Sequence, residues 1–250
     1  MNMIIKSVGL CCAFLPLSGI AADSDIETIS TQSSWDFSVE VYGQLTNIDG
    51  STQVGSGRVD ALTTDLNLSS NDIFSKLKMA GMVHTEGLHR SGFGYSFDYA
   101  FMNLDSSPVN ALLHQGVLEA KGFKRYEYDF GTLDYMAGIR WWDITLDAGN
   151  VEPGVDWIDY VVGVRYRKQL ATDWTFETLV DVGAGSDTQF TGQINSGVRY
   201  AMTDWSELHV AYKAVWVDYD NGNNDILNDG IAYRYDTVTH GLIVGWNIKF

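Results

Sequence analysis

The chain has 250 residues, of which 45% are hydrophobic and 13% aromatic, and its formal net charge at pH 7 is −16. Such an excess of negative charge argues against nucleic-acid binding, which requires basic surfaces. No segment carries the ~18 consecutive apolar residues of a transmembrane helix. Cys11 and Cys12 are the only cysteines. Both fall in an apolar N-terminal run, so we expect neither disulfides nor cysteine-based catalysis in the rest of the chain.

The first 22 residues resemble a secretory signal peptide. Lys6 supplies a positive start, an apolar run follows over 8–17, and small residues occupy 18–22. The run is too short to span a bilayer but suits the apolar core of a signal peptide. We expect cleavage after Ala22, or after Ala21, a periplasmic tail over 23–34 and a folded domain over 35–250. The alternative is a membrane anchor.

From residue 35 onward, apolar and polar residues alternate with a period of two, which is typical of strands with one apolar face. Short connections alternate with longer ones, as in outer-membrane barrels. We therefore predict an all-β fold, an antiparallel up-and-down transmembrane β-barrel of ten strands, with eight or twelve as alternatives. In chain order the expected strands are 35–45, 76–86, 93–101, 111–128, 133–141, 157–167, 174–183, 190–200, 205–217 and 238–250.

Two segments leave the strand count open. In 111–128, Phe123 falls on the polar side, and a bulge near Gly122 would restore the alternation. Residues 47–75 are expected to form a long loop. Within this segment, 59–68 could extend a hairpin, and 69–77 could start a short helix placed as a plug in the mouth or lumen.

The last stretch, 238–250, alternates cleanly and ends on Phe250. An exposed strand of this kind would invite aggregation in a soluble protein. In a barrel it closes against the first strand and turns its apolar side to lipid.

The same alternation sorts the charged residues by face. Nearly equal numbers of acids and bases fall on the inward side, so we expect a charge-balanced lumen filled by ion pairs. The inward acids are Asp36, Glu40, Glu86, Asp98, Glu119, Glu127, Asp134, Asp159, Glu177, Asp181 and Glu207, and the inward bases are Lys76, Lys78, Lys121, Arg125, Arg140, Arg165, Arg167, Arg199, Lys213 and Lys249. The expected ion-pair network comprises Glu40, Glu86, Asp98, Glu119, Arg140, Asp159, Arg165, Arg167, Glu177, Asp181, Arg199 and Lys213.

Large aromatic residues fall near the predicted strand ends. Rings at these positions are typical of the aromatic girdles at membrane interfaces. The expected girdle comprises Trp35, Trp174, Trp205, Trp216, Trp246 and Phe250.

Several motifs stand out along the chain: the segments 157–166 and 181–187, the repeated Gly-Val-Arg-Tyr at 197–200, Val217-Asp-Tyr219 and the terminal 245–250. Together they resemble a family of uncharacterised proteobacterial outer-membrane β-barrel proteins, similar in kind to the small OmpA-like and OmpW-like barrels. The resemblance implies a barrel in the Gram-negative outer membrane and no established chemistry.

The function that we expect is structural, or a narrow passage for small solutes. We expect no cofactor, no metal site and no catalytic residue. Two alternatives stay open. The first is an outer-leaflet lipid- or peptide-modifying enzyme, with His240 beside Asp236 and Thr237 or Thr239 as a candidate group. The second is a surface adhesin that acts through acidic loops, which contain Asp218, Asp220, Asp225, Asp229 and Asp236.

The partners that this interpretation implies are outer-membrane lipid and lipopolysaccharide. During biogenesis, the Sec translocon would export the chain and the barrel-assembly machinery would insert it. Nucleic acid is not an expected partner.

Overall fold

The computed structural model describes residues 33–56, 59–106, 111–147, 154–221 and 231–250. Eleven antiparallel strands and one short helix make up this part of the chain. None of its helices is long and apolar enough to cross a membrane. The strands are β1 (Trp35–Ser56), β2 (Val59–Leu68), β3 (Leu77–His89), β4 (Phe93–Ser106), β5 (Ala111–Tyr128), β6 (Gly131–Asp147), β7 (Gly154–Ala171), β8 (Trp174–Gly185), β9 (Thr188–Thr203), β10 (Ser206–Asp220) and β11 (Ile231–Lys249).

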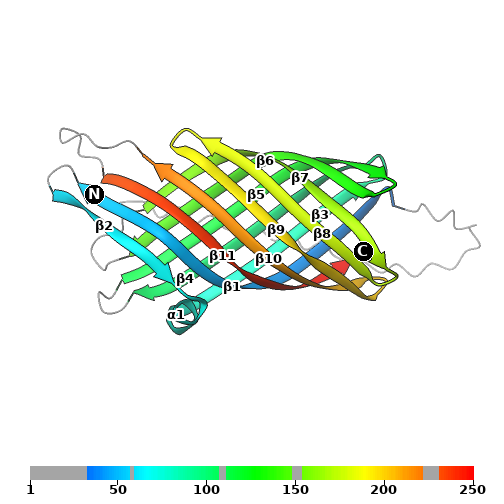
Figure 1. Ribbon diagram of the computed structural model, residues 1–250, viewed down its shortest axis with the longest axis horizontal. Helices are drawn as coiled ribbons and strands as arrows, with labels where there is room; N and C mark the ends of the chain where they lie inside the picture. The colour runs from blue at the N-terminus through cyan, green and yellow to red at the C-terminus, as the bar shows by residue number, and fades with distance from the viewer. Residues whose placement is uncertain (1–32, 57–58, 107–110, 148–153, 222–230) are drawn as a thin grey trace, which may run out of the picture. The chain divides into compact units, whose positions relative to one another are not determined.

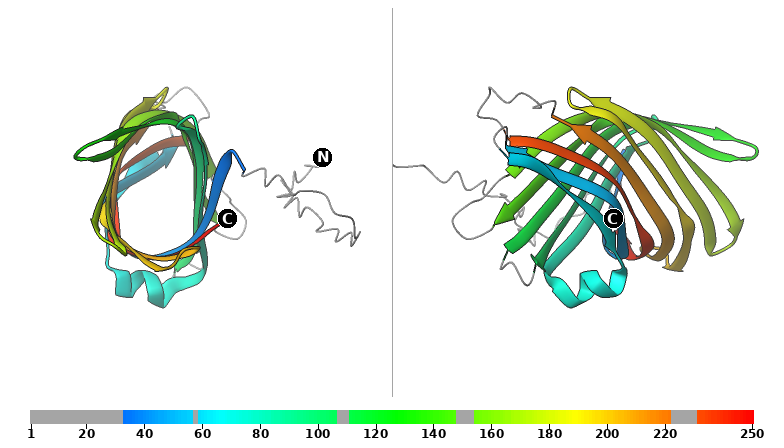
Figure 2. Two further views of the ribbon diagram at one scale, coloured as in Figure 1. Left: turned by 90° about the vertical axis from the view of Figure 1, so that its right-hand side faces the viewer. Right: turned by 60° about the vertical axis from the view of Figure 1, so that its left-hand side comes forward.

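The sheet closes into a barrel with ten wall positions, as predicted. Consecutive strands from β3 to β11 are neighbours, and β11 pairs with β1 from Ser38↔Lys249 to Ser56↔Ile231. β2 adds no position to the wall, because β2 and β3 pair with different parts of the same edge of β1. Figure 1 shows the tilted strands from the side, and the left-hand view of Figure 2 looks along the ring that they form.

The two ends of the barrel differ. At the turn end, β3–β4, β5–β6, β7–β8 and β9–β10 are joined within two or three residues, and Phe250 forms two backbone hydrogen bonds with Phe37. At the loop end, β1, β4, β6 and β10 finish at Ser56, Ser106, Asp147 and Asp220. β8 and β9 are also joined tightly there, by residues 186–187, where a longer connection was expected.

Residues 47–75 do not form the expected long loop. β1 continues to Ser56, β2 pairs back on it, and a helix, α1 (Ser70–Lys76), precedes β3. Asp72 stands three residues after the N-cap Ser69, and the two form a reciprocal capping box. α1 lies at the periphery of the ring in both figures, so it is not a plug along the barrel axis.

The expected bulge at Gly122 is also absent. β5 pairs without a register shift with β4 and with β6. Phe123 is 4% exposed on the lumen side. Its ring lies 5.0 Å from the guanidinium carbon of Arg165 and 5.7 Å from that of Arg125. An aromatic face attracts guanidinium groups, so Phe123 belongs among the inward charges.

The outward face carries an apolar band. On β4, the outward residues are aromatic from Phe93 to Phe101 and become polar at Asn103. On β1, the band ends at Leu45 and is followed by Asn47. A stretch of ~9–11 residues is what a tilted strand needs to cross a bilayer, so the strands continue beyond the band toward the loop end.

The capping box makes the titration of Asp72 a test of α1. Hydrogen bonds from the Ser69 hydroxyl and backbone hold the pKa of the Asp72 carboxyl below its ordinary value. Because its pKa is lowered in the folded state, ionised Asp72 stabilises the helix at pH values above the ordinary carboxyl pKa. This stabilisation is lost as the pH falls through the lowered pKa. We expect Ser69→Ala to raise the Asp72 midpoint, as measured by carboxyl NMR shifts in micelles. Ser75→Ala is the control, because the Ser75 hydroxyl donates to the Asp72 backbone carbonyl and should leave the midpoint in place.

Candidate functional site

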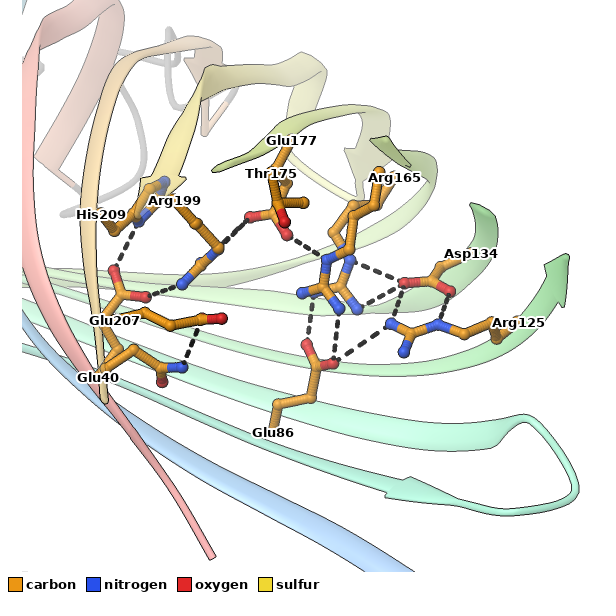
Figure 3. Close-up of polar contacts among 12 residues, drawn as sticks. Glu40, Glu86, Arg125, Asp134, Arg165, Thr175, Glu177, Arg199, Glu207 and His209 are labelled. Carbon is orange, nitrogen blue, oxygen red and sulfur yellow. Dashed lines mark hydrogen bonds and ion pairs between the residues drawn. The ribbon is translucent and has the colours of Figure 1, made fainter. Parts of the chain in front are cut away.

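Inward side chains from eight strands form a connected ion-pair cluster near the turn end, drawn in Figure 3. We call it the turn-end network. Its members are Glu40, Glu86, Arg125, Asp134, Arg165, Arg167, Glu177, Arg199 and His209. Four guanidinium groups face four carboxylates, so the cluster is neutral when His209 is neutral.

Asp134 and Glu86 hold one side of the turn-end network. Arg125 binds both oxygens of Asp134, with Nε–Oδ1 at 2.7 Å and Nη2–Oδ2 at 2.9 Å. Arg165 Nε and Nη2 donate to Asp134 Oδ2 at 2.8 and 2.7 Å, and its Nη1 donates to Glu86. Such two-pronged pairs fix both direction and distance. Asp134 is 1% exposed, so its charge depends on these partners.

Glu177 and Glu40 continue the network across the barrel. Glu177 accepts hydrogen bonds from Arg167 and Arg199, and the Arg199 Nη2–Glu177 Oε1 distance is 3.1 Å. Arg199 Nη1 lies 2.7 Å from Glu40 Oε2, and His209 Nδ1 lies 2.7 Å from Glu40 Oε1. Glu40 on β1 and Arg199 on β9 are 159 positions apart in the sequence, and β11 and β10 stand between their strands in the wall, so these contacts join strands that are not adjacent.

Closer to the middle of the barrel is a second cluster, the central network of Glu119, Lys121, Arg140, Asp181 and Thr191. Arg140 is completely buried. Its Nε donates to Glu119 at 3.0 Å, its Nη2 to Asp181 at 2.9 Å and its Nη1 to Thr191 at 2.9 Å. Lys121 pairs with both carboxylates. Two cations therefore balance two anions, as a region removed from water requires.

Asp98 and Lys213 form a looser pair, 4.0 Å apart. The Tyr42 hydroxyl donates to Asp98 at 2.7 Å, and His84 Nδ1 lies 3.2 Å from its other oxygen. His84 Nε2 also lies 3.9 Å from Glu86. His84 therefore connects this group with the turn-end network.

Asp159 departs from the expectation. It is fully buried, but it forms no ion pair within the described ranges. Instead, the indole N–H groups of Trp142 and Trp157 donate to its Oδ2 at 3.1 and 3.3 Å. Asp159 was expected to form an ion pair, but the side chains that bind it at this level of the lumen are aromatic.

The loop-end half of the lumen is filled by an apolar cluster, the aromatic layer. Its buried members are Trp142, Ile144, Trp157, Val217, Tyr219 and Tyr235. The Trp157 ring stacks on Trp142 at 5.6 Å and on Tyr219 at 4.1 Å between centroids. The ion pairs described above lie in the turn-end half and the middle of the lumen, whereas the aromatic layer, together with the buried Thr188 and Thr237, occupies the loop-end half.

Spaces of different size lie along the lumen between these layers. A vestibule of about 600 Å³ opens at the turn end, where Asp36, Arg167 and Lys249 line it. Beyond the turn-end network, one cavity measures about 60 Å³ and another about 70 Å³. The second touches both Lys213 and Trp142, so it lies between the charges and the aromatic layer.

The expected girdle residues lie at two levels; Trp35, Trp174, Trp216 and Trp246 are on the outward face, whereas Trp205, in the β9–β10 turn, and Phe250 also line the turn-end vestibule. Trp35, Trp174, Trp205, Trp246 and Phe250 belong to the turn end, where Trp174 contacts Tyr200 at 4.9 Å and the Trp246 N–H donates to Ser206 at 2.8 Å. Trp216 lies toward the loop end of β10, opposite Val238.

A polar chain also lies on the outward face, above the apolar band. His240 Nε2 is 2.8 Å from Asp49 Oδ2, and its Nδ1 is 2.6 Å from the Tyr212 hydroxyl. These residues come from β1, β11 and β10. The candidate partners Asp236, Thr237 and Thr239 do not bind His240, and Thr237 is 3% exposed on the lumen side.

The acidic loop expected near the C-terminus is partly strand. Asp218 and Asp220 belong to β10, and Asp236 belongs to β11. Arg234 pairs with Asp220. Asp225 and Asp229 lie outside the described residues. Among those that are described, no three His, Cys, Asp or Glu side chains form a group that could hold a metal ion.

Some members of these clusters could have been found from the sequence. The alternation along the strands turns Asp134, Lys121 and Arg125 inward (inward parity), but they were not part of the expected network. Trp142 and Trp157 are two residues from Arg140 and Asp159, so the same alternation places their rings in the lumen. The alternation predicts which face a charged residue takes but not which ion-pair partner it has, because partners on non-adjacent strands depend on how the barrel closes.

Comparison with known proteins establishes the fold. No protein-family profile and no curated protein sequence matches the chain. The solved structure of the outer membrane protease OmpT from Escherichia coli is similar, with a TM-score of 0.56 and 10% identity over 90% of this chain and 99% of that one. Neisserial surface protein A matches with a TM-score of 0.36 and 10% identity, over 87% of this chain and 98% of that one. The chain therefore has the architecture of an integral outer-membrane β-barrel.

Arg140 provides a test of the central network. Arg140→Met would leave two buried carboxylates with one cation, and we expect a loss of about 3–5 kcal/mol in the free energy of unfolding. Urea titration of tryptophan fluorescence in lipid vesicles measures it. Combining Arg140→Met with Asp181→Asn restores neutrality and should recover part of the loss. Arg234→Met removes an exposed pair and should have a much smaller effect; equal losses in Arg140→Met and Arg234→Met would contradict the importance of burial.

Proposed function

We propose that this protein is a closed outer-membrane barrel whose lumen serves as a structural core, so that its activity toward other molecules lies on its outer surface. One observation carries the proposal: two neutral ion-pair networks and an aromatic layer follow one another along the bore. An open channel needs a continuous hydrated path, which barrels of sixteen or more strands provide. With ten wall positions, the inward arginine and tryptophan side chains are long enough to meet across the bore.

The outer surface suits a fixed position in the membrane. The apolar band would face lipid, and the expected girdle residues at its two edges would contact the headgroups. In the usual orientation of such barrels, the turn end is periplasmic and the loop end extracellular. Outer-membrane lipid and lipopolysaccharide would then be the immediate partners, with export and insertion by the Sec translocon and the barrel-assembly machinery.

Conductance in planar bilayers tests the closed lumen. The wild-type protein should give no steps in conductance, because ions would have to displace paired charges and then pass stacked aromatic rings. Combined Arg140→Ala, Trp142→Ala and Trp157→Ala substitutions should open a path and produce steps. Trp216→Ala, which removes an outward indole, is the matched control and should stay silent.

The narrow-passage alternative predicts the reverse for the wild-type protein. If the wild-type protein already gives conductance steps, and if these steps are larger after Arg165→Ala, the lumen is not a closed core. That result would favour a gated pore. The shift in gel mobility on heating, typical of folded barrels, would show that each variant is inserted and folded.

A second candidate function rests on the chain Asp49–His240–Tyr212. An imidazole that accepts the phenol proton at Nδ1 and is stabilised by a carboxylate at Nε2 would activate the Tyr212 oxygen as a nucleophile. At the outer edge of the apolar band, its substrate would be an ester bond of an outer-leaflet lipid. The phenolate would attack the carbonyl, the leaving alkoxide would take the proton from His240, and water would then release the acyl group.

Mass spectrometry of lipopolysaccharide incubated with the purified protein tests this second candidate. The wild-type protein should remove an acyl chain, and His240→Phe should abolish the mass change. His114→Phe is the matched control, because His114 is also outward and binds an asparagine, Asn103, at 2.9 Å. An unchanged lipid mass with the wild-type protein would exclude this reaction for the probe used.

A further inference from the structure

The barrel wall is interrupted between β1 and β3. Their register runs from Trp35↔His89 to Val41↔Val83 and then stops. From Tyr42 to Asn47, β1 pairs with β11 alone. From Leu77 to Met82, β3 pairs with β4 alone. We call these two facing edges the seam. Within the described ranges, it is the one place in the wall where neighbouring strands diverge.

α1 crosses the loop-end part of the seam and is tied to both sides of it. The Ser70 backbone N–H donates to Asn47 Oδ1 on β1 at 2.8 Å. Ile73 is 4% exposed and packs with Ile48 of β1 and with Met102 and Leu104 of β4. Ile48 and Met102 have lumen-side parity, whereas α1 lies at the periphery of the ring (Figure 2). Ile73 therefore reaches the inner side of the wall from outside.

Behind the seam lies the cavity of about 70 Å³. Both edges of the seam contribute to it, β1 with Gln44 and Thr46 and β3 with Met82. Ala100, Met102, Val117 and Val215 add apolar groups to the lining, and Gln115 and Thr239 add polar ones. Phe101 also lines the cavity although its parity is outward, which indicates that the space extends into the wall at this place.

Charged and aromatic side chains border the cavity along the barrel axis. On the turn-end side it meets Asp98, Glu119 and Lys213, and on the loop-end side it meets Trp142 of the aromatic layer. The seam is the way in from the side. On the outward face, Leu45 lies on its β1 edge, and Phe101 of β4 lies beside its β3 edge, opposite Gly81. These are the last apolar residues before the polar Asn47 and Asn103, so the seam would open onto the hydrocarbon of one leaflet.

We propose that the seam is a lateral entry through which the end of a hydrocarbon chain of an outer-leaflet lipid occupies this cavity. An alkyl chain gains packing contacts there and gives up only equivalent contacts with lipid. A cavity of about 150 Å³ holds a benzene molecule, so half that volume suits the end of one chain. α1 covers the entry and limits it to a flexible, slender ligand. The inference goes beyond a closed lumen, because a chain that enters sideways crosses neither charge network.

Photolabelling tests the proposal directly. The protein is placed in phosphatidylcholine vesicles that contain a small fraction of lipid with a diazirine midway along one acyl chain, irradiated, digested and mapped by mass spectrometry. We expect label on Met82 and Met102, which line the cavity, in addition to label on outward residues. Met136, which lines the neighbouring charged cavity, serves as the inward background position.

Ala100→Phe fills the cavity and should abolish the labelling of Met82 and Met102 while outward labelling persists. Ala137→Phe adds the same bulk to the outer face of β6 and should leave both patterns unchanged. Val215→Phe replaces Ala100→Phe if that variant lacks the heat-dependent mobility shift of a folded barrel. Labelling of Met82 and Met102 no stronger than that of Met136, or labelling that survives filling of the cavity, would overturn the proposal.

Discussion

The architecture depends on keeping charge neutral where water is excluded. Arg140 loses all contact with solvent, and a lone guanidinium in that position would cost several kcal/mol. Glu119 on the adjacent strand β5 and Asp181 on β8 offset this cost, and Lys121 balances the second of their charges. The turn-end network repeats the arrangement with four arginines. Since the partners come from different strands, the ion pairs also fix the position of each strand relative to those across the bore.

Much of the fold could be predicted from the alternation of side chains. A period of two reports directly on which face each residue takes, and it predicted ten wall strands. It was less informative for 47–75, where the chain leaves the wall and pairs with its own preceding strand before returning through α1. The predicted bulge near Gly122 was wrong for a different reason. An aromatic ring such as Phe123 can pack against arginines on the polar face as well as against lipid, so its inward position requires no bulge.

The candidate site was predictable as a set of inward charges but not as a network. Parity places Glu40 and Arg199 on the same side of the wall, yet their contact spans 159 positions of sequence and exists because β1 closes on β11. Asp159 has the parity of its neighbours, but Trp142 and Trp157 take the place of cations beside it. The chain Asp49–His240–Tyr212 likewise needs three adjacent strands in register before its members meet.

The neutrality of each network has a consequence for how the protein responds to its surroundings. Because the two clusters sum to zero, the whole net charge of −16 belongs to the rest of the chain. Dissolved salt screens interactions between exposed charges beyond about 10 Å at 0.1 M ionic strength, and it screens buried pairs such as those of Arg140 much less. The central network should therefore keep its strength as the ionic strength changes, whereas repulsion among the surface acids weakens with added salt. Ionic conditions would change what the outer surface of this barrel attracts more than they change the barrel itself.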